Sequence, residues 1–224
     1  DVLITFDDIS KIFGDPDFTL SATSSSTGAF TFSIADGSVA SVSGNTVTIQ
    51  GAGSTIVTVN QAADSNYNSA TATMTLTVVK ANPTITFDDI TKVLSDPDFS
   101  LSASSNSSGV FTYSIANSGV ATVSGASVSL EGLGSTTVTV NQAADNNYNS
   151  GTASMTLTVN KPVPLIDFND ITKSVGDPDF TLSATSSSTG AFTYSIADGN
   201  VATVSGNTVT IQGAGSTIVT VNQA

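Results

Sequence analysis

Carboxylates are the groups in this 224-residue chain with the most chemical potential, because the chain contains no His and no Cys. The usual general bases and thiol nucleophiles are therefore missing, and catalysis would depend on carboxylates, Lys, Tyr or hydroxyl groups. Two close acidic pairs, Asp7/Asp8 and Asp15/Asp17, have the composition that a glycosidase uses, with one carboxyl as acid and the other as base or nucleophile.

Comparison of the chain with itself argues against catalysis by these pairs. Equivalent residues recur every 81 positions, yet Asp7 corresponds to Asn169 and Asp36 corresponds to Asn117. The pairs also lie in segments of turn composition, where Asp is favoured because its side chain hydrogen-bonds to nearby backbone. We therefore expect turn residues rather than an enzyme, with no catalytic residue and no cofactor.

A second acidic segment suggests a hard cation. Copies of it present one Asp and two Asn at alternate positions: Asp64, Asn66 and Asn68, then Asp145, Asn147 and Asn149. Calcium takes six to eight oxygen ligands, but these segments lack the following Gly and distal Glu of a calcium loop. We favour an Asx-rich turn before the last strand, with Tyr67 packed as a corner residue, and keep bound calcium as the alternative. The sequence assigns no metal or ligand-binding residue.

Two recurring patterns have both a functional and a structural explanation. Threonines at every second position of residues 71–77 would suit contact with ice or carbohydrate, but outward threonines on a solvated strand explain them more simply, and we favour that explanation. Lys11, Lys92 and Lys173 recur, and Lys to Asn isopeptide bonds are known covalent staples. These lysines stand beside acidic turns rather than in an apolar strand, so we expect them to be exposed to solvent.

The spacing of 81 residues predicts a tandem array of one small domain. Phe6, Phe87 and Phe168 stand in the same context, which defines copy one (residues 1–80), copy two (81–161) and copy three (162–224). Copy three stops at VNQA and lacks the final strand, either because the segment is cut there, which we favour, or because another molecule supplies the strand. Without an initiator Met or signal sequence, the chain is expected to be part of something longer.

Period-two alternation predicts β-strands throughout and no helix. In copy one the alternating apolar positions are Phe18, Leu20, Ala22, Phe30, Phe32, Ile34, Val47, Ile49, Met74, Leu76 and Val78. Val57 and Val59 are expected to point inward, because copy two replaces the intervening Ile56 with Thr137. With Ile4 and Phe6 opening each copy, six or seven strands per copy are predicted.

Turn residues separate the predicted strands. Asp15-Pro16 predicts the first two positions of a type I turn. A hairpin reversal is expected at residues 43–45 and a bend at 51–53, both rich in Gly. Short strands separated by Gly, Pro and Asx turns predict an antiparallel sandwich.

Charge and hydropathy limit the partners. Five Lys and Arg residues against eighteen Asp and Glu give a net charge of -13, which repels nucleic acid and anionic membranes. No apolar run approaches the roughly 20 residues of a membrane helix. We expect neighbouring repeats of the same chain as partners, with no nucleic acid and no membrane insertion.

Several motifs together resemble bacterial immunoglobulin-like (Big/MBG-type) repeats. They are the Gly-Asp-x-x-Phe turn at 14–18, the Val-Ala-x-Val-x-Gly-x-x-Val stretch at 39–47, and Tyr67 before the last strand. Copy two departs with Ser95 in place of the Gly, and copy three lacks the Tyr and the final strand. The resemblance implies an all-β array of immunoglobulin-like antiparallel sandwiches forming an extended rod at the bacterial cell surface, as in giant adhesins, including gliding-motility adhesins of Bacteroidota.

The function that follows is a noncatalytic stalk or spacer that extends and displays an adhesive region. Pro83, Pro162 and Pro164 lie at the joints and favour extended, semi-rigid backbone there. The alternatives are a self-assembling filament subunit that exchanges a strand, and a module that binds a ligand directly. A binding module predicts a copy-specific cluster of exposed aromatics, whereas the aromatics here recur at core-like positions of every copy. The sequence does not specify the adhesive target, the number of repeats or the anchoring route.

Overall fold

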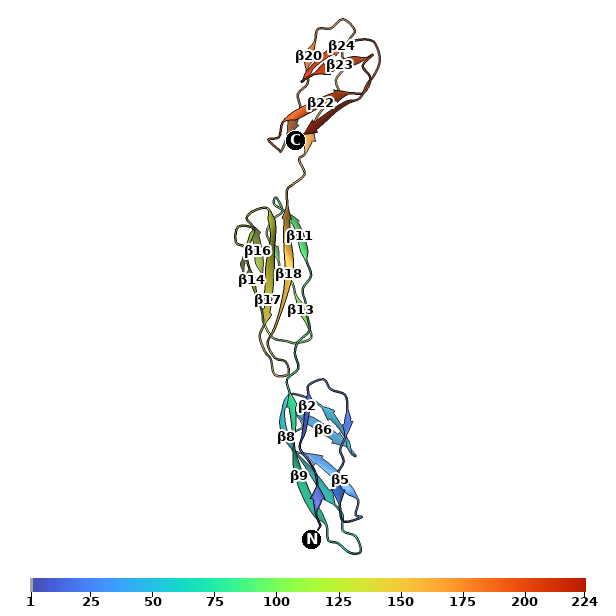
Figure 1. Cartoon of the computed structure of the whole chain (residues 1–224), viewed down its shortest axis with the longest axis vertical. Helices are drawn as coiled ribbons and strands as arrows, with labels where there is room; N and C mark the ends of the chain where they lie inside the picture. The colour runs from blue at the N-terminus through green and yellow to red at the C-terminus, as the bar shows by residue number, and fades with distance from the viewer. Residues whose placement is uncertain (1) are drawn as a thin grey trace. The chain divides into compact units, whose positions relative to one another are not determined.

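The computed structural model describes residues 2–224, and the regular elements in that range are all β-strands (Figure 1). Two compact units are present, Asp1–Lys161, which holds copies one and two, and Pro162–Ala224, which is copy three. Among the described residues, no helix is long and apolar enough to cross a membrane.

Within residues 2–224, copies one and two have nine strands each, and copy three has seven. Copy one contains β1 (Ile4–Thr5), β2 (Ile9–Ile12), β3 (Phe18–Thr19), β4 (Thr23–Ser24), β5 (Phe30–Ile34), β6 (Ala40–Ser43), β7 (Thr46–Ile49), β8 (Gly53–Gln61) and β9 (Ala70–Val79). Copy two contains β10 (Ile85–Thr86), β11 (Ile90–Val93), β12 (Phe99–Ser100), β13 (Ser104–Ser105), β14 (Phe111–Ile115), β15 (Ala121–Ser124), β16 (Ser127–Leu130), β17 (Gly134–Gln142) and β18 (Gly151–Asn160). Copy three contains β19 (Ile166–Asp167), β20 (Phe180–Thr181), β21 (Thr185–Ser186), β22 (Phe192–Ile196), β23 (Ala202–Ser205), β24 (Thr208–Ile211) and β25 (Val219–Gln223).

The order of the strands confirms the predicted immunoglobulin-like sandwich. In copy one the larger sheet has the order β2-β9-β8-β5 and the smaller sheet has the order β3-β7-β6, with β1 paired to β4. Immunoglobulin domains place strands A, B, E and D in one sheet and C, F and G in the other. Strands β3, β7 and β6 take the places of B, E and D, while β5, β8 and β9 take those of C, F and G. Strand β1 takes the place of A.

Two details differ from the expected antiparallel sandwich of six or seven strands. Strand β2 runs parallel to β9, with Ile9 opposite Leu76 and Ile12 opposite Val79, and β11 pairs with β18 in the same way. The strand count was too low because strand A is divided into β1 and β2, and strand B into β3 and β4. A two-residue strand contains too little alternation to be detected in a sequence.

The alternation along β8 and β9 places the core as predicted. Val57 and Val59 are fully buried, whereas Ile56 between them is 45% exposed. Met74, Leu76 and Val78 on β9 are buried as well. Val57, Met74, Leu76 and Val78 join residues of the smaller sheet in the core cluster of copy one, whose buried members are Leu20, Val39, Ala40, Val47, Val57, Met74, Leu76 and Val78.

The turn chemistry was predicted in part. Gly44 has a φ of 61° in the two-residue connection between β6 and β7, which confirms the hairpin reversal. The turn near Asp15 is different, because Asp15 closes it rather than opens it. The carbonyl of Ile12 accepts a hydrogen bond from the Asp15 N–H (3.0 Å), and Gly14 supplies a φ of 93°. The Asp15 carboxylate then accepts the N–H of Ile12 (2.9 Å), so both ends of this turn are hydrogen-bonded.

Copy three shows what the final strand contributes. Residues 51–62 and 213–224 have the same twelve-residue sequence, yet the first forms the nine-residue strand β8 and the second forms the five-residue strand β25. Strand β8 lies between β5 and β9, whereas β25 pairs with β22 alone among the described residues. The counterpart of β2 is not a strand in copy three, and its Ile171 is 47% exposed. The same residues therefore form the longer strand only where β9 is present.

The core of copy three is correspondingly smaller. Its buried hydrophobic residues are Leu182, Ala202 and Val209. Val219 and Val221 are only half-buried, although their counterparts Val57 and Val59 are fully buried. One face of the copy-three core is thus open where β9 would cover it.

Amide hydrogen exchange should separate the two identical segments. We expect the amides of residues 217–221 to exchange faster than those of residues 55–59 by about tenfold or more, because opening β25 breaks one ladder instead of two. The identical sequences give equal intrinsic exchange rates, so each segment is the control for the other. Residue-resolved NMR exchange measures the effect, and equal protection of both segments would contradict the difference in pairing.

Candidate functional site

The loop between β8 and β9 is organised by the carboxylate of Asp64. Its Oδ1 accepts hydrogen bonds from the backbone N–H groups of Asn66 and Tyr67, both at 2.8 Å. Its Oδ2 accepts from the Ser26 hydroxyl (2.9 Å) and from the N–H (2.8 Å) and hydroxyl (2.9 Å) of Thr27. Five protein donors thus converge on one carboxylate and tie this loop to the Ser-rich segment after β4.

Copy two repeats this arrangement around Asp145. Its Oδ1 accepts from the N–H groups of Asn147 (2.8 Å) and Tyr148 (2.7 Å). Its Oδ2 accepts from the Ser107 hydroxyl (2.9 Å) and from the N–H (2.8 Å) and hydroxyl (2.9 Å) of Ser108. The same five-donor geometry in two copies shows that it belongs to the fold of the repeat.

These donors stabilise the charged form of both carboxylates. At Asp64 the N–H of Asn66, followed by the N–H of Thr27 and the hydroxyl of Ser26, holds the pKa well below its usual range. At Asp145 desolvation acts to raise the pKa. The hydrogen bonds, led by the N–H of Ser108, outweigh it, so this pKa is also well below the usual range.

The geometry favours the turn interpretation over bound calcium. A carboxylate offers about four lone-pair positions, and five protein donors already share those of Asp64 and those of Asp145. A calcium ion at either loop would have to displace the donors that close it.

The expected packing of Tyr67 as a corner residue is wrong. Tyr67 is 37% exposed, and its counterpart Tyr148 is half-buried against a different copy. The Tyr148 ring packs edge-on against Phe13 of copy one, with centroids 5.5 Å apart. Asn147 also reaches copy one, where its Oδ1 accepts the N–H of Ala52 (2.9 Å). Sequence reasoning missed this contact because no local pattern relates residues so distant in the chain.

One member of each acidic pair, Asp8 and Asp15, binds backbone. Asp8 Oδ1 accepts the N–H of Thr75 on β9 (2.6 Å), and Asp89 Oδ1 accepts the N–H of Thr156 on β18 (2.6 Å). Asp15 is held in its turn, as described above. Each carboxylate satisfies a backbone donor at the end or edge of a strand, which is the structural use of Asp expected from the sequence.

The recurring lysines lie over aromatic rings. The three ammonium groups stand 4.9, 4.8 and 5.1 Å from ring centroids, in the pairs Lys11–Phe18, Lys92–Phe99 and Lys173–Phe180. Lys11 and Lys92 are half-buried, so the expectation of solvent exposure is correct only for Lys173. Cation–π contacts of this kind contribute about 0.5–1 kcal/mol at exposed sites.

The threonines of β9 face away from the core. Thr71 donates a hydrogen bond to Asn60 Oδ1 (2.8 Å), and the hydroxyls of Thr77 and Ser54 are 3.3 Å apart. These are contacts across the β8–β9 ladder on the outer face of the sheet. They agree with the structural explanation of the threonine pattern.

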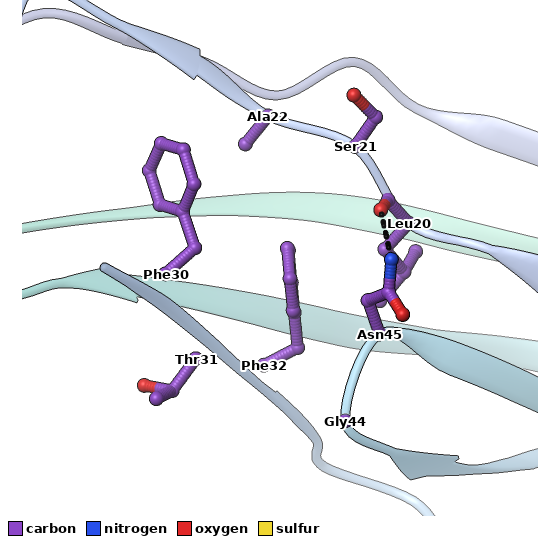
Figure 2. A pocket seen from close by; sticks show the side chains of 8 residues that line it. All are labelled: Leu20, Ser21, Ala22, Phe30, Thr31, Phe32, Gly44 and Asn45. Atoms are coloured by element: carbon purple, nitrogen blue, oxygen red, sulfur yellow. Dashed lines mark hydrogen bonds between the residues drawn. The ribbon is translucent and has the colours of Figure 1, made fainter. Parts of the chain in front are cut away.

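One hollow of about 660 Å³ lies beside β5 and the β6–β7 turn. Figure 2 shows Phe30 and Phe32 projecting into it and the Asn45 amide donating to the carbonyl of Leu20 (3.4 Å). A similar hollow in copy three is lined by the counterparts Phe192 and Tyr194. Its aromatics thus recur between copies, whereas a dedicated binding module predicts a copy-specific cluster.

Comparison with known proteins gives structural likeness only. No protein-family model and no curated protein sequence matches the chain. Similar solved structures include Drosophila N-cadherin EC1-3 (15% identity, TM-score 0.31, 70% of this chain and 65% of that chain) and Sidekick-1 immunoglobulin domains 1-5 (13%, 0.31, 99% and 60%). A third is surface layer protein SbsC, domains 4-9 (14%, 0.30, 100% and 45%). The chain spans less than two thirds of each of these three.

Acid should reveal the contribution of Asp145. Its pKa is lower in the folded than in the unfolded chain, so its stabilisation is complete above an unfolded pKa of about 3.9 and is lost as pH falls toward the folded value. We expect Asp145→Asn to lower the thermal midpoint at pH 7, and the gap from the unsubstituted chain to shrink between about pH 5 and pH 2. Circular dichroism measures both midpoints.

Asp17→Asn is the matched control, because Asp17 is exposed and the substitution removes the same single negative charge. Its midpoints should follow those of the unsubstituted chain at every pH. If the two variants gave the same pH profile, net charge rather than loop closure would explain the effect.

Proposed function

We propose that this chain is a noncatalytic stalk or spacer segment of a bacterial cell-surface adhesin that extends and displays an adhesive region. The observation that carries the proposal is that the recurring polar side chains bind groups of their own copy. Asp64 binds five donors of its own copy, Lys11 lies over Phe18, and Asp8 binds the edge of β9. These side chains hold the repeat together, so adding a copy adds length without adding a reactive site.

The extracellular setting is supported by the composition and by the resemblance to bacterial immunoglobulin-like repeats. A net charge of -13 keeps a long repetitive chain soluble, and stability comes from packing because no Cys is present to form disulfides. Attachment to a surface during gliding motility is one setting for such a stalk, and it rests on the resemblance alone.

A second candidate is a filament subunit assembled by strand exchange. In this chain the edge of β25 is unpaired within the described residues, and Ile218 beside it is 72% exposed. An incoming strand with the sequence of β9 would pair with that edge and cover Val219 and Val221. A direct ligand-binding module is less favoured, because the hollow at Phe30 and Phe32 recurs in copy three.

Hydrodynamic and scattering measurements test the stalk directly. We expect sedimentation velocity to show an elongated monomer at all concentrations. Strand β9 has 10 residues, so at about 3.3 Å per residue one copy contributes on the order of 33 Å of length. Deleting residues 81–161 should therefore shorten the maximum dimension from small-angle X-ray scattering by at least this amount.

Other outcomes would overturn the proposal in recognisable ways. A maximum dimension unchanged by the deletion would mean that the copies do not add in line. Oligomers that grow with concentration, and that dissociate when a peptide of the β9 sequence is added, would favour the filament.

A further inference from the structure

The joint between copy one and copy two is an ordered structure rather than a loose linker. Ala81 lies in the linker. Its N–H donates to the carbonyl of Asn147 (3.0 Å), and its carbonyl accepts the N–H of Asn149 (2.8 Å). This pair of bonds forms a parallel bridge between Ala81 and Tyr148. The loop at residues 145–149, which we name the clasp loop, therefore holds the linker through the backbone.

Side chains reinforce the same contact. The Lys80 ammonium donates to the carbonyl of Asp145 (2.6 Å), and the Asn149 amide donates to Asn82 Oδ1 (2.9 Å) and to the carbonyl of Lys80 (3.4 Å). The clasp loop thus contacts three successive residues of the linker, which leaves the linker little freedom to bend at that point.

The clasp loop also reaches the body of copy one. Its Tyr148 packs on Phe13, which lies in the turn after β2, and its Asn147 binds the N–H of Ala52 in the bend before β8. A Cβ on the neighbouring Gly51 would lie 3.4 Å from Asn147 Oδ1 and 2.7 Å from the carbonyl of Ser38, so the approach at this bend is close. Contacts with linker, turn and bend together fix the direction of copy two on copy one.

Copy one carries the same loop with no copy in front of it among the described residues. Residues 64–68 read DSNYN and residues 145–149 read DNNYN. Asp64 closes its loop with the hydrogen bonds that Asp145 makes, so the two loops have the same internal shape. Asn66 and Tyr67 are nevertheless exposed, while Asn147 and Tyr148 are half-buried. The loops differ in sequence only at Ser65 and Asn146, and within the described residues only the second loop has a preceding copy to contact.

The surface that receives the loop is present in every copy. The position of Phe13 is held by Leu94 in copy two and by Val175 in copy three, so it stays apolar. The position of Gly51 is Gly in all three copies, namely Gly51, Gly132 and Gly213. Both halves of the contact therefore belong to the repeat, and one repeat can engage the end of another.

We propose that the clasp loop is a docking element that locks each copy onto the C-terminal end of the copy before it, and that residues 64–68 are a docking surface for the end of another repeat of this kind. Asp145 closes the loop internally, which leaves Asn147, Tyr148 and Asn149 free to make the contact. This proposal concerns only the contact between adjacent copies, so it can be tested independently of the proposed stalk function.

A pair of spin labels tests the lock in the 224-residue chain. Thr31→Cys and Thr112→Cys place one label on β5 and one on β14, both at exposed positions in a chain with no other Cys. Double electron–electron resonance should give a narrow distance distribution. The double variant Asn147→Ala and Tyr148→Ala removes the contacts with Phe13 and Ala52, so copy two is held by its bonds to the linker alone. The distribution should then broaden by about twofold or more, because the remaining attachment is to a short linker rather than to the body of copy one. The backbone donors to Asp145 are retained, so the loop itself stays folded.

Asn66→Ala and Tyr67→Ala form the matched control, because they make the same chemical change in the loop that has no preceding copy. This variant should leave the distribution unchanged. An unchanged distribution in the Asn147 and Tyr148 variant, or equal broadening in both variants, would overturn the proposal.

A longer chain tests the docking surface of copy one. A further repeat, residues 1–81, is placed before Asp1, and labels at Thr31 of the added repeat and Thr31 of the original copy one report the new joint. The control pair of substitutions at Asn66 and Tyr67 of the original copy one should now broaden the distribution, because these residues have gained a partner. If the new joint is broad with the loop unsubstituted, or is unaffected by these substitutions, residues 64–68 are not a docking surface.

Discussion

The pairing of β8 with β9 is the constraint on which each copy depends. All nine residues of β8 are opposite residues of β9, and the far edge of β9 in turn pairs with β2. Where the chain offers no counterpart of β9, in copy three, the partner strand shortens, the β2 segment is not a strand, and the core keeps only three buried hydrophobic residues. One ladder therefore determines the edge, the length of the central strand and the closure of the core.

The connection between these two strands is also where the copies meet. Asp145 uses its oxygens on donors of its own copy, which fixes the shape of the loop and lowers the pKa of the carboxylate. Because the loop is closed from within, the side chains of Asn147 and Tyr148 point toward copy one rather than folding back. The same short loop thus stabilises its own sandwich through Asp145 and orients that sandwich on copy one through Asn147 and Tyr148.

Comparison of equivalent residues in successive copies was the best guide to the roles of the polar side chains. The acidic pairs and the lysines looked like candidates for catalysis or covalent linkage when read one copy at a time. In the structure Asp8 and Asp89 make equivalent bonds to backbone, and each of the three lysines lies over the equivalent Phe ring of its own copy. A side chain that has an equivalent structural partner in successive copies serves the fold of the repeat, and this supports the proposed stalk function.

The sequence by itself determined the all-β class, the inward faces of β8 and β9 and the Gly44 hairpin, because alternation and turn chemistry are local properties of a strand and its ends. It misplaced the turn at Asp15 and the packing of Tyr67, and it could not distinguish a calcium ligand from a loop-closing carboxylate at Asp64. Those outcomes depend on Ile12 at the turn, on Phe13 as the partner of Tyr148, the counterpart of Tyr67, and on Thr27 as a donor to Asp64. Their positions follow only from the folded chain. The tertiary structure alone decided that one twelve-residue sequence forms a long strand in copy one and a short one in copy three, because strand length is set by the neighbour available for pairing.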